Sequence, residues 1–302
     1  MNTQTNAVDG TVWAMLLLLS LLWGGSFIFV ELALRDLQPL TIVAMRVCIG
    51  ALLLLAIVRL KKLVFPLDLK SILQFALMGT LNNAIPFSLI VWGQQSIDAG
   101  RASILNATVP LFTVVLAHWF LADEKLNAAK ITGVIVGFAG VVVLVGPGAE
   151  TANSSIGQLA ILGAAISYAF AAIFGRQLSR FDPLVSACGM LCASTVIMLP
   201  LALVLESHAE FQPGLLPLFS VIALGVASTA IAYLLYFRIL GRAGSSNLSL
   251  VTFLIPPSAI LMGVMFLQEK VSINETIGLA LILAGMAIAT GFYRRFLKTT
   301  QP

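Results

Sequence analysis

Long apolar segments alternate with short polar connections along nearly the whole chain. Runs such as 12–30 and 131–145 carry no charged side chain. An α-helix needs about 20 predominantly apolar residues to cross the ~30 Å hydrocarbon layer of a bilayer. The pattern therefore predicts an all-α membrane protein with ten transmembrane helices, at 12–31, 40–60, 70–92, 102–121, 129–146, 156–175, 183–205, 215–237, 246–268 and 272–293.

The polar connections between these segments are too short to form a second, soluble domain. The chain also lacks the glycine loop followed by Lys that binds nucleotide phosphates. These features exclude a nucleotide-binding domain within the chain. A transporter built from this sequence uses a solute or ion gradient, or works passively.

Composition supports the membrane assignment and narrows the possible chemistry. The chain is 59% hydrophobic and 10% charged, with a mean hydropathy of +1.02, whereas soluble domains carry about 25% charged residues. Cys48, Cys188 and Cys192 all fall in apolar segments, which favours packing over a disulfide framework. Two histidines and scattered carboxylates argue against a membrane-embedded enzyme. We expect no catalytic residue, metal or cofactor.

The distribution of basic residues predicts the orientation in the membrane. With both termini in the cytoplasm, 13 of the 17 Lys and Arg residues lie on the cytoplasmic side. Cytoplasmic loops characteristically carry this excess of positive charge. The net charge of +4 is thereby explained, and we expect a lipid bilayer and a small-molecule substrate as partners, with no nucleic acid. The sequence carries no indication of an oligomeric state.

The two halves of the chain repeat each other. An offset of 145 residues aligns identical residues: Glu124 with Glu269, Lys125 with Lys270, Gly133 with Gly278, and Gly140 with Gly285. The predicted units are 1–147 and 151–298, with five helices each. An odd number of crossings inverts the second unit, as in many secondary transporters whose site lies at the repeat interface.

Three motifs resemble those of a known family. They are the segment Trp23-Gly24-Gly25-Ser26-Phe27, the pair Pro39 and Arg46, and the series Pro110, Glu124, Gly133 and Gly140, which recurs in the second half from Pro256. The pattern resembles the EamA-type branch of the drug/metabolite transporter superfamily. That resemblance implies a ten-span bacterial inner-membrane exporter of amino acids or other metabolites. It also implies a central cavity surrounded by the first, third and fourth helices of each half.

Polar and aromatic residues within the spans are the candidates for this cavity, because buried polar groups in lipid are costly. The predicted substrate-binding residues are Trp23, Phe27, Asn83, Phe87, Gln94, Asn106, Tyr168, Tyr233 and Tyr236. Small and polar residues also mediate packing between helices, and aromatic residues also anchor helices at the membrane–water interface.

Arg46 and Glu31 are the candidate gating or electrostatic residues, with Glu31 as a possible partner of Arg46. The alternative for Arg46 is a side chain that extends to the membrane surface. Pro110 and Pro256 each remove a backbone donor and predict helix kinks.

These features favour a secondary transporter that exports amino acids or similar neutral or zwitterionic metabolites. The absence of Lys and Arg from spans 156–175 and 246–268 argues against phosphorylated sugars. A drug or toxic-cation exporter remains an alternative. The inverted repeat favours alternating access over a channel.

Overall fold

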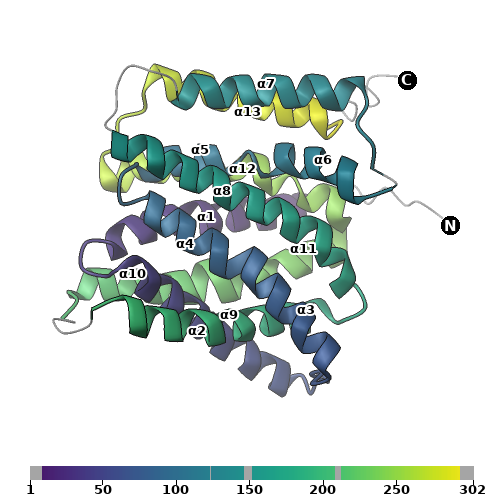
Figure 1. Ribbon diagram of the computed structural model, residues 1–302, viewed down its shortest axis with the longest axis vertical. Helices are drawn as coiled ribbons and strands as arrows, with labels where there is room; N and C mark the ends of the chain where they lie inside the picture. Colours follow the sequence, from purple (N-terminus) through teal and green to yellow (C-terminus); the bar gives the residue numbers. More distant parts are fainter. Residues whose placement is uncertain (1–8, 123, 146–151, 208–211, 293–302) are drawn as a thin grey trace.

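The computed structural model describes residues 9–122, 124–145, 152–207 and 212–292, and within these ranges it is helical and contains no strand (Figure 1). The elements are α1 (Gly10–Ala33), α2 (Pro39–Leu60), α3 (Leu69–Gly79), η1 (Thr80–Ala84), α4 (Ile85–Gly93), α5 (Ala99–Asn106), α6 (Val109–Phe120), α7 (Ala128–Val145), α8 (Ala152–Phe174), η2 (Gly175–Leu178), α9 (Pro183–Leu205), α10 (Leu215–Gly225), η3 (Val226–Ile231), α11 (Ala232–Leu248), α12 (Val251–Met262), η4 (Gly263–Leu267) and α13 (Ile273–Ala289).

These elements join into the crossings that the sequence predicts. Among the described residues, eight helices are long and apolar enough to span a membrane, and the shorter apolar helices Val251–Leu267 and Ile273–Ala289 complete the ten. The predicted all-α membrane fold is confirmed. The domain limits 1–147 and 151–298 fall on or next to residues outside the described ranges and stay a prediction.

One helix break agrees with the predicted boundaries and one departs from them. Two helical segments of α11 meet at Gly244, which lies in the predicted connection 241–245 and has the non-helical angles φ 79° and ψ 167°. Glycine adopts this backbone conformation without strain because it has no Cβ. The predicted helix 102–121 is divided into α5 and α6 by a two-residue turn at 107–108.

The packing of helices is paired between the two halves. Helix α2 packs against α9, and α7 against α13. Other large contacts also come in matched pairs: α4 with α8 corresponds to α11 with α1, and α3 with α9 corresponds to α10 with α2. Exchanging the halves therefore preserves these contacts, a pattern typical of an inverted repeat.

Glycines form the contact between α7 and α13, which lie side by side at one edge of the bundle (Figure 1). A Cβ at Gly285 would lie 2.4 Å from the Gly137 nitrogen, and one at Gly133 would lie 2.4 Å from the Ala289 nitrogen. A Cβ at Gly140 would lie 2.8 Å from the Gly278 oxygen. Small residues permit such backbone contact between membrane helices. The repeat-related glycines thus pack against one another.

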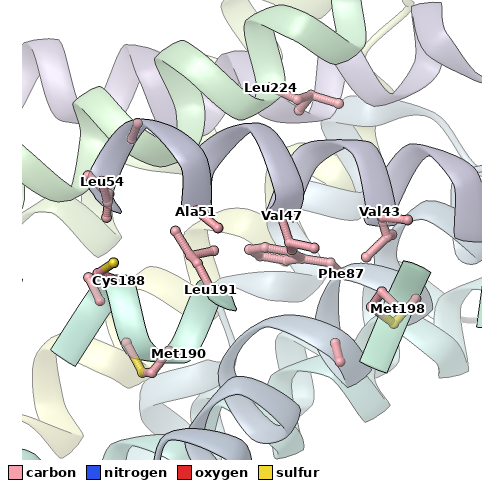
Figure 2. Close-up of a cluster of buried hydrophobic side chains, with 14 of the residues drawn as sticks. Val43, Val47, Ala51, Leu54, Phe87, Cys188, Met190, Leu191, Met198 and Leu224 are labelled. Atoms are coloured by element: carbon pink, nitrogen blue, oxygen red, sulfur yellow. The ribbon is translucent and has the colours of Figure 1, made fainter. Parts of the chain in front are cut away.

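The largest apolar cluster lies between α2 and α9. Figure 2 shows apolar side chains of α2 packed against those of α9, with Phe87 of α4 and Leu224 of α10 nearby. Its α2 and α9 members include Val43, Val47, Ala51, Leu54, Cys188, Met190, Leu191 and Met198. This cluster fixes α2, which carries Arg46, against the second half.

The third helix of each half contains a π-helical segment that the sequence pattern does not predict. Gly79 precedes η1, and Gly225 precedes η3. A Cβ at Gly79 would lie 2.5 Å from the Met190 oxygen, and a Cβ at Gly225 would lie 2.6 Å from the Ile49 Cβ. Each segment therefore begins where the helix touches its neighbour most closely. Such π segments are frequent at functional sites.

Candidate functional site

Arg46 lies inside the bundle, with 6% of its surface exposed. Its Nε donates a hydrogen bond of 3.0 Å to Thr229 Oγ1, and the Thr229 hydroxyl donates to the Leu224 carbonyl at 2.8 Å. The guanidinium carbon lies 3.7 Å from the centre of the Phe87 ring. Gly50 permits this approach of α2 to η3, because a Cβ there would lie 2.8 Å from Thr229 Cγ2.

Tyr168 of α8 and Tyr233 of α11 lie close enough to Arg46 to interact with it electrostatically. Both tyrosines are half-buried. We call Arg46, Phe87, Tyr168, Thr229 and Tyr233 the Arg46 cluster. It draws on α2, α4, α8, η3 and α11, and hence on both halves of the chain.

A hydrogen-bond network continues from this cluster into η1. The Tyr233 hydroxyl donates to Asn83 Oδ1 at 3.2 Å and accepts from Asn82 Nδ2 at 3.0 Å. Asn83 Nδ2 donates to Ser194 Oγ of α9 at 3.2 Å. Asn82 and Ser194 are additions that the sequence reasoning missed. Counting an ideal α-helical face selects Asn83 and rejects its neighbour, whereas the π segment lets both amides reach Tyr233.

The other aromatic candidates lie along α11 and α1. The Trp23 and Tyr236 rings are 5.9 Å apart, and Phe237 lies 5.3 Å from Tyr236 and 6.1 Å from Tyr233. The aromatic side chains thus connect Trp23 to the Arg46 cluster. Phe237 was not among the predicted site residues.

Three of the predicted residues lie outside both the Arg46 cluster and the side chains connected to it. Phe27 is buried in a separate apolar cluster with residues of α5 and α8. Gln94 Nε2 donates to the Phe27 carbonyl at 2.9 Å. Gln94 Oε1 and Asn106 Oδ1 are enclosed and accept no hydrogen bond from the described residues.

Glu31 does not pair with Arg46 in the described structure; it lies with Glu269 at the start of α5. The Ala99 nitrogen is 3.2 Å from Glu31 Oε2 and 2.9 Å from Glu269 Oε1, and the Gly100 nitrogen is 3.1 Å from Glu269 Oε2. The two carboxyl groups therefore satisfy backbone donors that a helix start leaves open. Burial raises the pKa of the Glu269 carboxyl, although the two N–H donors act in the opposite direction.

Polar contacts link the two halves at both ends of the bundle. Beside Glu269, the Arg101 Nε lies 3.0 Å from Glu275 Oε1; we call this the Glu269 end. At the opposite end, Arg180 donates to Gln74 Oε1 at 2.6 Å, and an Arg242 nitrogen lies 2.7 Å from an Asp9 carboxylate oxygen. Side-chain contacts between the two halves are therefore present at both ends of the bundle.

The two candidate kink prolines lie in different settings. Pro110 stands in the first turn of α6, directly after the turn that separates α5 from α6. Pro256 lies inside α12, followed by Pro257. The prolines of the two halves thus occupy different positions: Pro110 follows a turn, whereas Pro256 lies within a continuous helix.

The described helices form a bundle of ten apolar crossings, and a buried polar cluster inside it is built from both halves of the chain. This arrangement defines a multi-pass membrane protein of the transporter class. The EamA-like transporter family matches the chain twice, at residues 11–146 and 155–291, and the chain belongs to that family. Each match covers one half of the chain.

Individual relatives cover almost the whole chain. The uncharacterized transporter YoaV of Bacillus subtilis is 25% identical over 279 residues, 91% of this chain and 95% of the relative. The uncharacterized inner membrane transporter YedA of Escherichia coli is 25% identical over 281 residues, 92% of this chain and 90% of the relative. A probable terminal-alkyne amino-acid exporter of Streptantibioticus cattleyicolor is 27% identical over 215 residues, 71% of this chain and 72% of the relative. A solved crystal structure has the same fold, with a TM-score of 0.68 at 20% identity, covering 95% of this chain and 99% of that chain.

Proposed function

We propose that this member of the EamA-like family is a secondary transporter that exports amino acids or similar small neutral or zwitterionic metabolites. The observation that carries the proposal is the Arg46 cluster. It combines one positive charge, hydroxyl groups and aromatic faces, and it lies where elements of both halves meet. These groups match a solute that has one carboxylate and an apolar body.

The relatives support the proposal without determining the solute. The Streptantibioticus cattleyicolor protein is named as an amino-acid exporter, and YedA as an inner membrane transporter. We accordingly place this chain in a bacterial inner membrane, with both termini in the cytoplasm as the basic residues indicate. In that orientation the Glu269 end faces outward.

The paired halves support transport by alternating access. Rearrangement of one half against the other would expose the Arg46 cluster first to one side and then to the other. The π segments η1 and η3 flank the cluster and are candidates for the points at which the helices bend. The contacts of Glu269 and Arg101 would close the outward side, and those of Arg180 and Arg242 the inward side.

A drug or toxic-cation exporter is the weaker candidate, because Arg46 would repel a cation at the centre of the site. A membrane-embedded enzyme is weaker still, since the chain belongs to a transporter family. We assign no catalytic residue or cofactor.

A metabolite screen tests the proposal. Cells that overproduce the protein are compared with cells that carry an empty vector, and with cells that overproduce the Arg46→Gln variant at equal membrane abundance. The proposal predicts amino acids enriched in the medium of the first culture alone. Unchanged amino acids together with increased resistance to cationic dyes would favour the drug exporter.

A further inference from the structure

Arg46 is a buried charge without a counter-ion. Among the described residues, no Asp or Glu side chain pairs with it, and the groups that act on it electrostatically are Tyr168 and Tyr233, which are neutral at physiological pH. A buried charge is normally paired or bound to a ligand. The carboxylate that balances Arg46 is therefore missing from the described part of the chain.

The guanidinium also keeps most of its hydrogen-bonding capacity free. It has five N–H donors, and among the described residues only Thr229 accepts a hydrogen bond from it, at Nε. The Nη1 and Nη2 nitrogens donate to no described residue. Unlike Gln94 Oε1 and Asn106 Oδ1, which are fully enclosed without a partner, these two nitrogens are not fully enclosed. The free donors therefore keep some accessible surface.

The neighbours hold the guanidinium ready for a planar anion. Phe87 covers one face at 3.7 Å and the Thr229 hydroxyl fixes the Nε edge. The edge formed by the two Nη groups remains open. Arginine binds a carboxylate through two parallel hydrogen bonds along such an edge.

The site is not a repeated feature of the fold. The 145-residue offset places Leu191 at the position of Arg46, Ala232 at that of Phe87, and Ala84 at that of Thr229. Leu191 is fully buried in the apolar cluster between α2 and α9. The second half therefore builds the same packing without a charge, so the helix contact alone does not require an arginine at this position.

From these observations we infer that Arg46 is the residue that binds the carboxylate of the transported solute, and that a solute needs one carboxylate to be transported. This inference rests on the proposed function and narrows its substrate class. Within the described ranges, no second Lys or Arg acts electrostatically on Arg46, Tyr168 or Tyr233. A single cation balances a monoanion, which selects amino acids and monocarboxylic acids over phosphate dianions.

Three matched solutes separate the carboxylate from the rest of the molecule. Leucine carries both charged groups, 4-methylpentanoate keeps only the carboxylate, and isopentylamine keeps only the amine. The full chain is reconstituted in liposomes. The wild type is compared with Arg46→Gln, with Arg46→Lys, and with Arg59→Gln, which removes an exposed arginine from the last turn of the same helix. Uptake of labelled leucine into leucine-loaded liposomes is measured with each unlabelled compound as competitor.

The inference predicts that leucine and 4-methylpentanoate compete with labelled leucine and that isopentylamine does not. Arg46→Gln should reduce uptake at least tenfold, Arg46→Lys should retain part of it, and Arg59→Gln should match the wild type. Competition by the amine alone, or unchanged uptake by Arg46→Gln, would overturn the inference while leaving a transporter in place.

A binding measurement separates failure of the inference from failure of the proposed function. The thermal unfolding of the purified full chain is followed with each of the three compounds. A carboxylate-dependent increase in Tm in the wild type, absent in Arg46→Gln, supports the inference even if no leucine crosses the bilayer, in which case the proposed function fails. An equal response of wild type and variant, or no response to any carboxylate, contradicts the inference.

Discussion

Replacing Gly285 by Ala tests how the two halves are held together. The added Cβ would lie 2.4 Å from the Gly137 nitrogen and 2.6 Å from the Gly133 oxygen, whereas ordinary contact begins at 3.4 Å. Both close atoms belong to backbone, so α7 and α13 must separate by about 1 Å. Overpacking of this kind costs about 1–3 kcal/mol.

Gly241→Ala is the matched control. It makes the same chemical change within α11, where an added Cβ would meet nothing within 4 Å. Alanine is favoured over glycine in a helix by roughly 0.5–1 kcal/mol, so this variant should be as stable as the wild type or slightly more stable.

Thermal unfolding of the two purified variants in one detergent measures the difference. One kcal/mol corresponds to a change in Tm of roughly 2–4 °C in large domains, so Gly285→Ala should unfold about 2–12 °C below the wild type. If Gly285→Ala were as stable as Gly241→Ala, the glycine contact would not hold α7 against α13, and the packing argument would fail.

Three further predictions concern the network, the Glu269 end and the topology. Tyr233→Phe removes the hydroxyl that joins Asn82 to Asn83. A net hydrogen bond contributes about 0.5–1.5 kcal/mol, so the apparent affinity for solute should weaken by roughly 2- to 12-fold in a counterflow titration. An unchanged affinity would exclude the network from solute binding. Because the pKa of Glu269 is raised in the folded protein, its contribution to stability is present at low pH and is lost as pH rises through that pKa. Tm should therefore fall over that pH range in the wild type and less in Glu269→Gln, whereas parallel curves would contradict the assignment. A reporter fused after Lys62 should be cytoplasmic and one fused after Gln212 external, and the reverse would invert the proposed orientation.

The hydropathy pattern predicts the ten helices because a long apolar segment has few alternatives in a membrane. The repeat-related glycines could likewise be identified from the sequence alone. Gly133 and Gly140 align with Gly278 and Gly285 in sequence, and the structure places them in mutual backbone contact. A glycine that recurs at equivalent positions of the two halves thus marks a position without room for a side chain, even before its partner is known.

The side-chain partners were harder to predict because depth in the membrane does not fix the direction in which a side chain points. Glu31 and Arg46 fall at similar predicted depths, yet Glu31 turns to the start of α5 and Arg46 to Thr229. The role of Glu269 depends on a helix start brought close by folding, which sequence spacing does not reveal. Asn82 was missed because the π segment changes the helical period locally.

The central claim is that this chain moves amino acids across a membrane by alternating access. Counterflow in liposomes tests it most directly, because loaded unlabelled amino acid drives accumulation of labelled amino acid without ATP or an imposed ion gradient. The account predicts accumulation in liposomes that contain the wild-type chain and none in protein-free liposomes. Folded wild-type protein that accumulates no amino acid above the protein-free level would contradict it.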